Sequence, residues 1–188
     1  MGYYQLKILL AGDGAVGKSS IVNRFVKGSF KTDYSHTVGV DTHSKEMNIN
    51  GDIIAKLLIW DVAGQEHYNF MRTNFYYGTD GVLLIFDLTR ADTFEHVKDW
   101  LKEINQVLGD DVPFVLIGNK VDLIEDIGDV ISHNEVMEFA EEQDVIYRET
   151  SAKTGLNVDI IFEDLTKIII KARTYGVDLF QNLWDLKK

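Results

Sequence analysis

The sequence contains no cysteine, which excludes disulfide bonds and thiolate metal sites and fits a reducing compartment. It has neither the pattern of a secretory signal at its start nor an apolar run of membrane-spanning length, so we expect a cytoplasmic protein. Basic residues are also scarce. The 19 Lys and Arg stand against 30 Asp and Glu, and the formal net charge of −11 argues against a nucleic-acid-binding protein or a polybasic membrane anchor.

Signals for lipid attachment are missing as well. N-myristoylation needs Ser or Thr at position 6, where this chain has Leu6, and prenylation needs a cysteine. The negative charge does not argue against binding a nucleotide, because a phosphate-binding loop uses backbone donors, one lysine and a metal ion.

Length and composition favour one domain with a full core, since 45% of the 188 residues are hydrophobic and no repeat or linker interrupts them. We expect this domain to cover residues 1–176, followed by a C-terminal tail at 177–188. Phe180 and Trp184 in the tail suggest a helix. A helix that packs on the domain, or a frayed end, is favoured over an amphipathic helix that docks on a partner or lies at a membrane surface, because Asp178 and Asp185 suit an anionic membrane poorly.

Apolar strands alternate with amphipathic helices, which predicts an α/β fold with a largely parallel sheet. Asn50 and Gly51 join two strands as a hairpin, so we expect one antiparallel strand at an edge. Asp92 is predicted to cap one helix, and Ser132 with Glu135 forms a capping box for another. The predicted strands cover residues 4–11, 40–49, 53–61, 81–87, 113–119 and 145–150; the predicted helices include 17–27, 69–77, 92–108 and 158–175.

The segment GDGAVGKS at residues 12–19 fits the phosphate-loop pattern G-x-x-x-x-G-K-[ST] and lies between a predicted strand and a predicted helix. Its glycines let backbone N–H groups turn inward around an anion, and the helix N-terminus adds further donors. Lys18 can reach the β- and γ-phosphates, and the Ser19 hydroxyl can ligate Mg²⁺. By chance the pattern would match in roughly 1 in 100 chains of this size, so a plain glycine turn is disfavoured.

A second set of residues completes a predicted phosphate and magnesium site. Asp61 ends an apolar strand, where a carboxylate needs a partner such as the hydration shell of Mg²⁺. Gly64 would let its N–H approach the γ-phosphate, and Gln65 can orient an attacking water. Thr37, in a long loop, could ligate Mg²⁺ if that loop closes.

The segment Asn119-Lys120-Val121-Asp122 follows another buried strand and predicts selection of guanine. A carboxylate such as Asp122 accepts two N–H bonds from the edge of guanine, and adenine lacks that donor pair. The Lys120 stem can pack on the base. After the sixth strand, residues 150–153 leave room for a backbone N–H to meet the guanine O6. Phe30 could cover the base or belong to the core.

These motifs together resemble the Ras superfamily of small GTPases, and most closely the Rab family, over about residues 4–175. The resemblance implies the P-loop NTPase fold of a small G domain, which has a six-stranded, mostly parallel sheet with one antiparallel edge strand and helices on both faces. It also implies GTP and GDP as ligands, Mg²⁺ as cofactor and slow intrinsic GTP hydrolysis. Segments 35–41 and 60–66 are similar to switch I and switch II, and Gly14 lies where an arginine finger would need room.

The residue roles follow from the motifs and from this resemblance. Gln65, Thr37 and Lys18 are the predicted catalytic residues, and Ser19, Thr37 and, through water, Asp61 are the predicted metal ligands. The predicted nucleotide-binding residues are Gly14, Ala15, Val16, Gly17, Lys18, Ser19, Ser20, Phe30, Thr37, Gly64, Asn119, Lys120, Asp122, Ser151, Ala152 and Lys153.

The sequence departs from the Rab pattern at several positions. Thr42 replaces the usual Phe, Val62 replaces Thr and Tyr77 replaces Arg. We expect a monomer that meets a GTPase-activating protein, an exchange factor and effectors through residues 30–42 and 61–77. Membrane association, at the cytosolic face, is left open by the missing prenylation cysteine. A guanine-nucleotide-binding scaffold that does not cycle is the main alternative function, and a P-loop ATPase or kinase is disfavoured by Asp122.

Overall fold

The computed structural model describes residues 2–30, 37–64, 72–128 and 130–175. The strands are β1 (Gly2–Ala11), β2 (Val40–Ile49), β3 (Ile53–Val62), β4 (Gly81–Asp87), β5 (Phe114–Asn119) and β6 (Ile146–Thr150). The helices are α1 (Lys18–Lys27), η2 (Thr73–Phe75), α3 (Ala91–Glu95), α4 (Val97–Leu108), η3 (Val121–Leu123), α5 (Ile124–Ile127), α6 (His133–Glu142) and α7 (Val158–Tyr175), of which η2 and η3 are 3₁₀ helices. No helix within these ranges is both long and apolar enough to span a bilayer.

The six strands form one sheet in the order β2-β3-β1-β4-β5-β6. β2 runs antiparallel to β3 at one edge, and the other four pairings are parallel. Asn50 and Gly51 turn the hairpin with φ of 55° and 81°, a region that Asn and Gly tolerate. The predicted sheet, with its antiparallel edge strand, is therefore confirmed.

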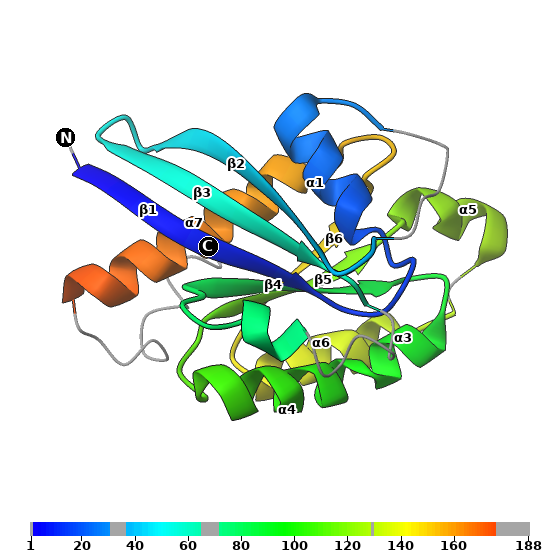
Figure 1. Cartoon of the computed structure of the whole chain (residues 1–188). Helices are drawn as coiled ribbons and strands as arrows, with labels where there is room; N and C mark the ends of the chain where they lie inside the picture. Colours follow the sequence, from blue (N-terminus) through cyan, green and yellow to red (C-terminus); the bar gives the residue numbers. More distant parts are fainter. Residues whose placement is uncertain (1, 31–36, 65–71, 129, 176–188) are drawn as a thin grey trace.

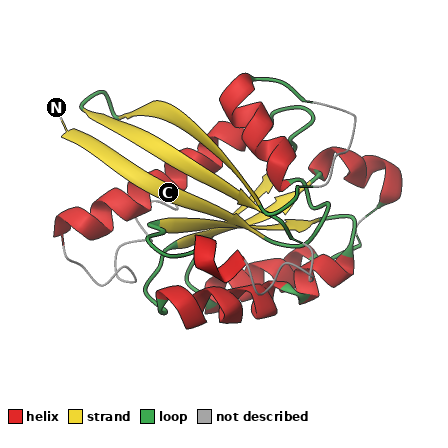
Figure 2. Cartoon of the chain, in the orientation of Figure 1, coloured by secondary structure: helices red, strands yellow, loops and turns green. Residues whose placement is uncertain are grey.

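Alternating strand residues build a core on each face of the sheet. In β1, Leu6, Ile8 and Leu10 belong to one core, while Leu9 and Ala11 belong to the other. Helices α1 and α7 cover the first face, and α3, α4 and α6 cover the second (Figures 1 and 2). Both faces are covered, as expected for a largely parallel sheet, and the α/β fold class is confirmed.

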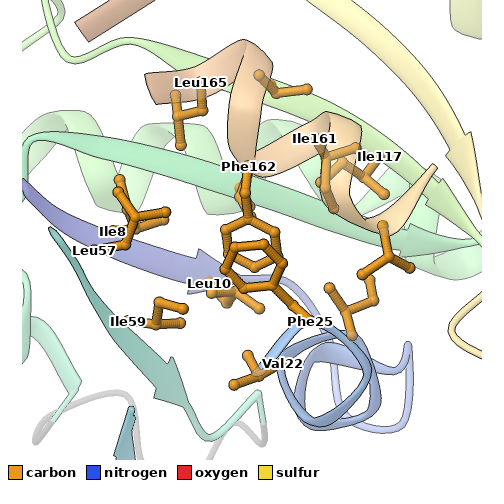
Figure 3. Packing of buried hydrophobic residues seen from close by; sticks show 14 of the residues in the cluster. Ile8, Leu10, Val22, Phe25, Leu57, Ile59, Ile117, Ile161, Phe162 and Leu165 are labelled. Carbon is orange, nitrogen blue, oxygen red and sulfur yellow. The ribbon is translucent and has the colours of Figure 1, made fainter. Parts of the chain in front are cut away.

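The first core fixes the helix that follows the phosphate loop. Phe25 of α1 stacks on Phe162 of α7 with ring centroids 3.8 Å apart and planes 9° apart (Figure 3). Ile8, Leu10 and Leu57 of the sheet belong to the same core. Packing of α1 against both the sheet and α7 therefore sets the position of its N-terminus.

The prediction that Asp92 caps a single helix is wrong. The N-cap is Arg90, two residues before the predicted cap, and Asp92 lies in the first turn of α3. The start is fixed by Thr93 instead, whose Oγ1 accepts the N–H of Asp87 at 3.0 Å and donates to the carbonyl of Arg90 at 2.7 Å. His96 then separates α3 from α4.

Two other helix predictions need qualification. Ser132 is the N-cap of α6 as predicted, but its side chain makes no capping hydrogen bond in the part of the chain that is described. Of the helix predicted at 69–77, the structure describes the 3₁₀ turn Thr73–Phe75, and residues 69–71 lie outside the described ranges.

Candidate nucleotide-binding site

The carboxyl ends of β1, β3, β4, β5 and β6 meet at one edge of the sheet, because these strands run parallel. The loops that follow them carry nearly all of the predicted site residues. In open α/β sheets this edge is the usual place for a ligand. The fold therefore gathers motifs that lie more than a hundred residues apart in the sequence.

The phosphate loop leads into α1 through Gly17. Gly17 is the N-cap of α1 with φ 103°, and a Cβ there would collide with the side-chain amide of Asn119. Its missing side chain also leaves the first N–H groups of α1 without a side-chain cap among the described residues. Free N–H groups at a helix N-terminus are the donors that a phosphate group requires.

Lys18 is 6% exposed, and its ammonium donates to the carbonyls of Gly12 at 2.6 Å and Asp13 at 2.7 Å. Burial lowers the pKa of Lys18 to about 8, although the charges of Asp61 and Asp13 oppose this shift. A phosphate beside this ammonium would supply the anion that its buried charge requires.

Ser19, Thr37 and Asp61 meet beside Lys18. The Ser19 hydroxyl donates to Oδ2 of Asp61 and lies 2.9 Å from Oγ1 of Thr37. Asp61 is 1% exposed, and its Oδ1 has no hydrogen-bond partner within the described residues. Burial raises the pKa of this carboxyl, against the opposing hydrogen bond from Ser19.

This donor set fits Mg²⁺, which prefers oxygen ligands and keeps several of its waters. Ser19 and Thr37 would hold the ion directly, and the unpartnered oxygen of Asp61 would accept a hydrogen bond from its water shell. The three predicted metal residues thus come together from α1, the loop before β2 and the end of β3.

Gly64 lies directly against the phosphate loop. A Cβ at this position would collide with the carbonyl of Gly12 and the backbone of Asp13. This close approach requires a glycine and places its backbone beside the loop, as expected for a phosphate contact. Gln65, the next residue, lies outside the described residues, so its catalytic role stays a prediction.

Asn119 joins the base loop to the phosphate loop. It is 1% exposed, and its Nδ2 donates to the carbonyl of Val16 at 2.8 Å. Its Oδ1 accepts the Thr150 hydroxyl at 3.0 Å and the Ala152 N–H at 3.3 Å. The predicted contact between the Ala152 N–H and guanine therefore has Asn119 as a competing acceptor.

Asp122 is held from the neighbouring loop. The Ser151 hydroxyl donates to its Oδ1 at 2.6 Å, and the ammonium of Lys153 lies 3.9 Å from its Oδ2. Lys120 has φ 70°, and its ammonium lies 2.6 Å from Oδ2 of Asp87. These contacts fix the side chains that would read and cover the base.

The remaining predicted residues vary in their setting. Ala15 is exposed, with φ 65°, and Ser20 lies in the first turn of α1. Phe30 is partly buried and packs against the first core, which is the core alternative, so its contact with the base stays a prediction. Of the two segments predicted to bind partners, residues 31–36 and 65–71 lie outside the described residues.

Sequence reasoning gave no role to Asp87 or Arg90. Asp87 ends an apolar strand and is 1% exposed, the same signal that pointed to Asp61. The Arg90 guanidinium donates to the carbonyl of Gly14 at 2.9 Å. Only the fold brings this arginine to the phosphate loop, because 76 residues separate the two in the chain.

The sheet order and the loops at its carboxyl edge define a P-loop nucleotide-binding fold. The Ras family model matches residues 7–171 of the chain.

Three curated relatives illustrate this similarity. The chain is 40% identical to Ras-related protein Rab-2B of Dictyostelium discoideum over 176 residues, which cover 94% of this chain and 86% of that protein. It is 40% identical to human Ras-related protein Rab-30 over 171 residues, with coverage of 90% and 83%. It is 34% identical to the Ypt/Rab-type GTPase YPT7 of Saccharomyces cerevisiae over 182 residues, with coverage of 94% and 87%. The chain therefore belongs to the Ras family as a Rab-like small GTPase.

Proposed function

We propose that this protein is a switch that binds and hydrolyses GTP with Mg²⁺. The observation that carries the proposal is the convergence of Ser19, Thr37 and Asp61 beside Lys18 at the edge of the sheet that also holds Asn119 and Asp122. The first group suits a magnesium triphosphate, and the second suits guanine.

Each side chain has a role in the proposed hydrolysis. Lys18 offsets the charge of the phosphates, and Asp122 accepts the N–H groups of the base. Gln65 orients a water for attack on the γ-phosphate without acting as a strong base. Mg²⁺, when bound, offsets negative charge that develops on the phosphate oxygens. Loss of the γ-phosphate releases Thr37 and Gly64, and this release is the switch.

The partner surface in this proposal is formed by residues 30–42 and 61–77. Thr42 pairs with Trp60 across the β2–β3 ladder, and Trp60 lies 6.2 Å from Phe75 between ring centroids. Tyr77 is 67% exposed and Val38 is 74% exposed. We propose that an activator, an exchange factor and effectors bind here, and that Thr42, in place of Phe, changes which effectors fit.

The similarity to Rab-type proteins supports a role in membrane trafficking, with the protein acting as a monomer in the cytoplasm or at the cytosolic face of membranes. The scarcity of basic residues disfavours a nucleic-acid partner.

Single-turnover hydrolysis of bound GTP tests the proposal. Wild-type protein should co-purify with guanine nucleotide and hydrolyse GTP slowly. Gln65→Leu should retain GTP and lose more than about 90% of the hydrolysis rate, since the attacking water is no longer oriented. Gln106→Leu is a matched control, because Gln106 is exposed on α4 away from the site.

A wild-type chain that binds GTP but leaves it intact would favour the scaffold that does not cycle. If Gln65→Leu hydrolyses GTP at the wild-type rate, the role of Gln65 is wrong.

A further inference from the structure

Asp87 is a buried carboxylate with four donors around it. Its Oδ1 accepts the N–H of Thr89 at 3.0 Å and the hydroxyl of Thr89 at 2.7 Å, and its Oδ2 is reached by Lys120 at 2.6 Å and Arg90 at 3.2 Å. Burial by itself raises the pKa of Asp87, but the hydrogen bonds from Lys120 and Thr89 outweigh burial and leave the pKa below its ordinary value. Asp87 is therefore charged at neutral pH and holds two cations at one oxygen.

The two cations lead to opposite halves of the site. Lys120 belongs to the base loop, and its stem is aligned by the contact of its ammonium with Asp87. Arg90 reaches the phosphate loop, where its Nη2 donates to the carbonyl of Gly14 at 2.9 Å. One carboxylate oxygen thus connects the loop that meets the base with the loop that meets the phosphates.

The hydrogen bond from Arg90 to the carbonyl of Gly14 sets the direction of a backbone N–H that would bind a phosphate. The carbonyl of Gly14 and the N–H of Ala15 belong to one trans peptide unit and point in opposite directions. A guanidinium that fixes the carbonyl on one side therefore fixes the Ala15 N–H on the other. Ala15 has φ 65°, which is uncommon for a residue with a side chain, so external contacts are needed to hold this conformation.

Other carbonyls of the phosphate loop are held in the same way. Lys18 binds the carbonyls of Gly12 and Asp13, and Asn119 binds that of Val16. Arg90 adds the carbonyl of Gly14 to this set.

We propose that Asp87 and Arg90 are positioning residues that tie the base loop to the phosphate loop and lengthen the residence time of the bound guanine nucleotide. This inference rests on the nucleotide binding proposed above. A purely local role is the alternative, since Thr93 and the backbone of Asp87 and Arg90 already form a turn after β4. The hydrogen bonds of that turn join its own residues, whereas the Arg90 guanidinium reaches the phosphate loop, so the two roles differ in their effect on nucleotide release.

The test measures dissociation of a fluorescent GDP analogue from the full chain in Mg²⁺. Arg90→Met keeps the length of the side chain but removes its donors, and it should release the analogue about tenfold faster, the effect of losing one charge-assisted hydrogen bond. Arg90→Lys, which keeps a charged donor, should release the analogue more slowly than Arg90→Met but faster than the wild-type protein. Asp87→Asn should accelerate release further, because both Lys120 and Arg90 lose a charged partner.

Arg148→Met is the matched control. The side chain of Arg148 is 38% exposed, as is that of Arg90, and its Nε lies 2.9 Å from Oδ2 of Asp164. Arg148 joins β6 to α7 and makes no hydrogen bond or ion pair with the phosphate loop among the described residues, so Arg148→Met should release the analogue at the wild-type rate. Circular dichroism confirms that each variant is folded at the temperature used.

Two outcomes would overturn the inference. Release from Arg90→Met at the wild-type rate would leave only the local role, and equal acceleration in Arg148→Met would point to general loosening. The ratio of variant to wild-type rates should also persist in excess EDTA, since Arg90 contacts a carbonyl and not the predicted metal ligands; a ratio that falls to one contradicts the assigned route. If wild-type protein retains no GDP analogue, the proposed nucleotide binding itself fails, before any variant is compared.

Discussion

Asp13 occupies a variable position of the phosphate loop. Its carboxylate is bound by two side chains at the start of α4, the N-cap His96 and Trp100. Trp100 Nε1 donates to its Oδ1 at 2.7 Å, and His96 Nδ1 lies 2.7 Å from its Oδ2. The hydrogen bond to Asp13 raises the pKa of His96, while slight burial opposes the shift and the charges of Asp92 and Asp99 add to it. Folding therefore favours the protonated form of this histidine.

The stability that His96 contributes should depend on pH. Because its pKa is higher in the folded than in the unfolded chain, the contribution is fully present below about pH 6.5, the ordinary pKa of histidine, and is lost as the pH rises through the folded value. We expect His96→Asn to lower the free energy of unfolding more at about pH 6 than at about pH 8.5, measured by urea denaturation.

His133→Asn serves as a control for this comparison. His133 also faces a carboxylate, that of Glu149, but at the longer distance of 3.4 Å and with a side chain that is 66% exposed, so its removal should matter less. A loss that is equal at both pH values in His96→Asn would mean that the pair with Asp13 adds no pH-dependent stability.

At the scale of single residues, the sequence predicts partners only where one position carries the signal alone. The sequence predicts a partner for Asp61, because a carboxylate at the end of an apolar strand needs one from outside the strand. The same signal exists at Asp87, but its partners Arg90 and Lys120 come from two different loops. No sequence spacing links those loops with Gly14, so the contacts that join Asp87, Arg90 and Gly14 are visible only in the structure.

At the scale of elements, the stack of Phe25 on Phe162 fixes α1, the helix whose N-terminus forms the phosphate site. Phe162 is 1% exposed, and we expect Phe162→Ala to reduce the free energy of unfolding by about 3–5 kcal/mol, since it leaves a cavity between two helices. Ile160→Ala, on the same helix but 43% exposed, should cost about 0.5 kcal/mol or less in the same urea titration. Equal losses in the two variants would show that the stack does not anchor α1.

Element prediction succeeded where local chemistry decides the structure. The hairpin follows from Asn50 and Gly51, which both adopt positive φ. The prediction that Asp92 caps the helix is wrong, because the start of the helix depends on the hydrogen bond between Thr93 and the end of β4, a contact with another element. A cap residue alone therefore does not locate a boundary when the preceding turn is held by the sheet.

At the scale of the whole molecule, the alternation of strands and helices predicts the parallel sheet but not the order of its strands. β1 pairs with β3 and β4, not with β2, and this choice depends on how the connections cross the sheet. Once that order is set, the strand ends bring Asp61, Asn119 and the phosphate loop together. The magnesium and base sites are thus a consequence of topology acting on motifs that are each weak alone.

This convergence buries the Asp61 carboxylate, and we expect Mg²⁺ to stabilise its charge. Asp61 is buried with one oxygen unpartnered among the described residues, and the Ser19 hydrogen bond and the charge of Lys18 do not fully offset the cost of burying its charge. With GDP present in EDTA, Asp61→Asn should therefore melt at or above the wild-type temperature, because the buried charge is gone. Adding Mg²⁺ at about 100 times its dissociation constant should raise the wild-type melting temperature by about 5–10 °C.

The same addition of Mg²⁺ should raise the melting temperature of Asp61→Asn much less, because the amide is a weaker partner for the water shell of the ion. Asp164→Asn is the matched control: its carboxylate pairs with Arg148 away from the site, so this variant should keep the full Mg²⁺-dependent rise. Were Asp61→Asn to keep the full rise as well, Asp61 would not belong to the shell of the metal. The combination of a stable EDTA form and a small Mg²⁺ response in one variant separates a metal role from a folding role, since a residue needed only for folding would lower both melting temperatures.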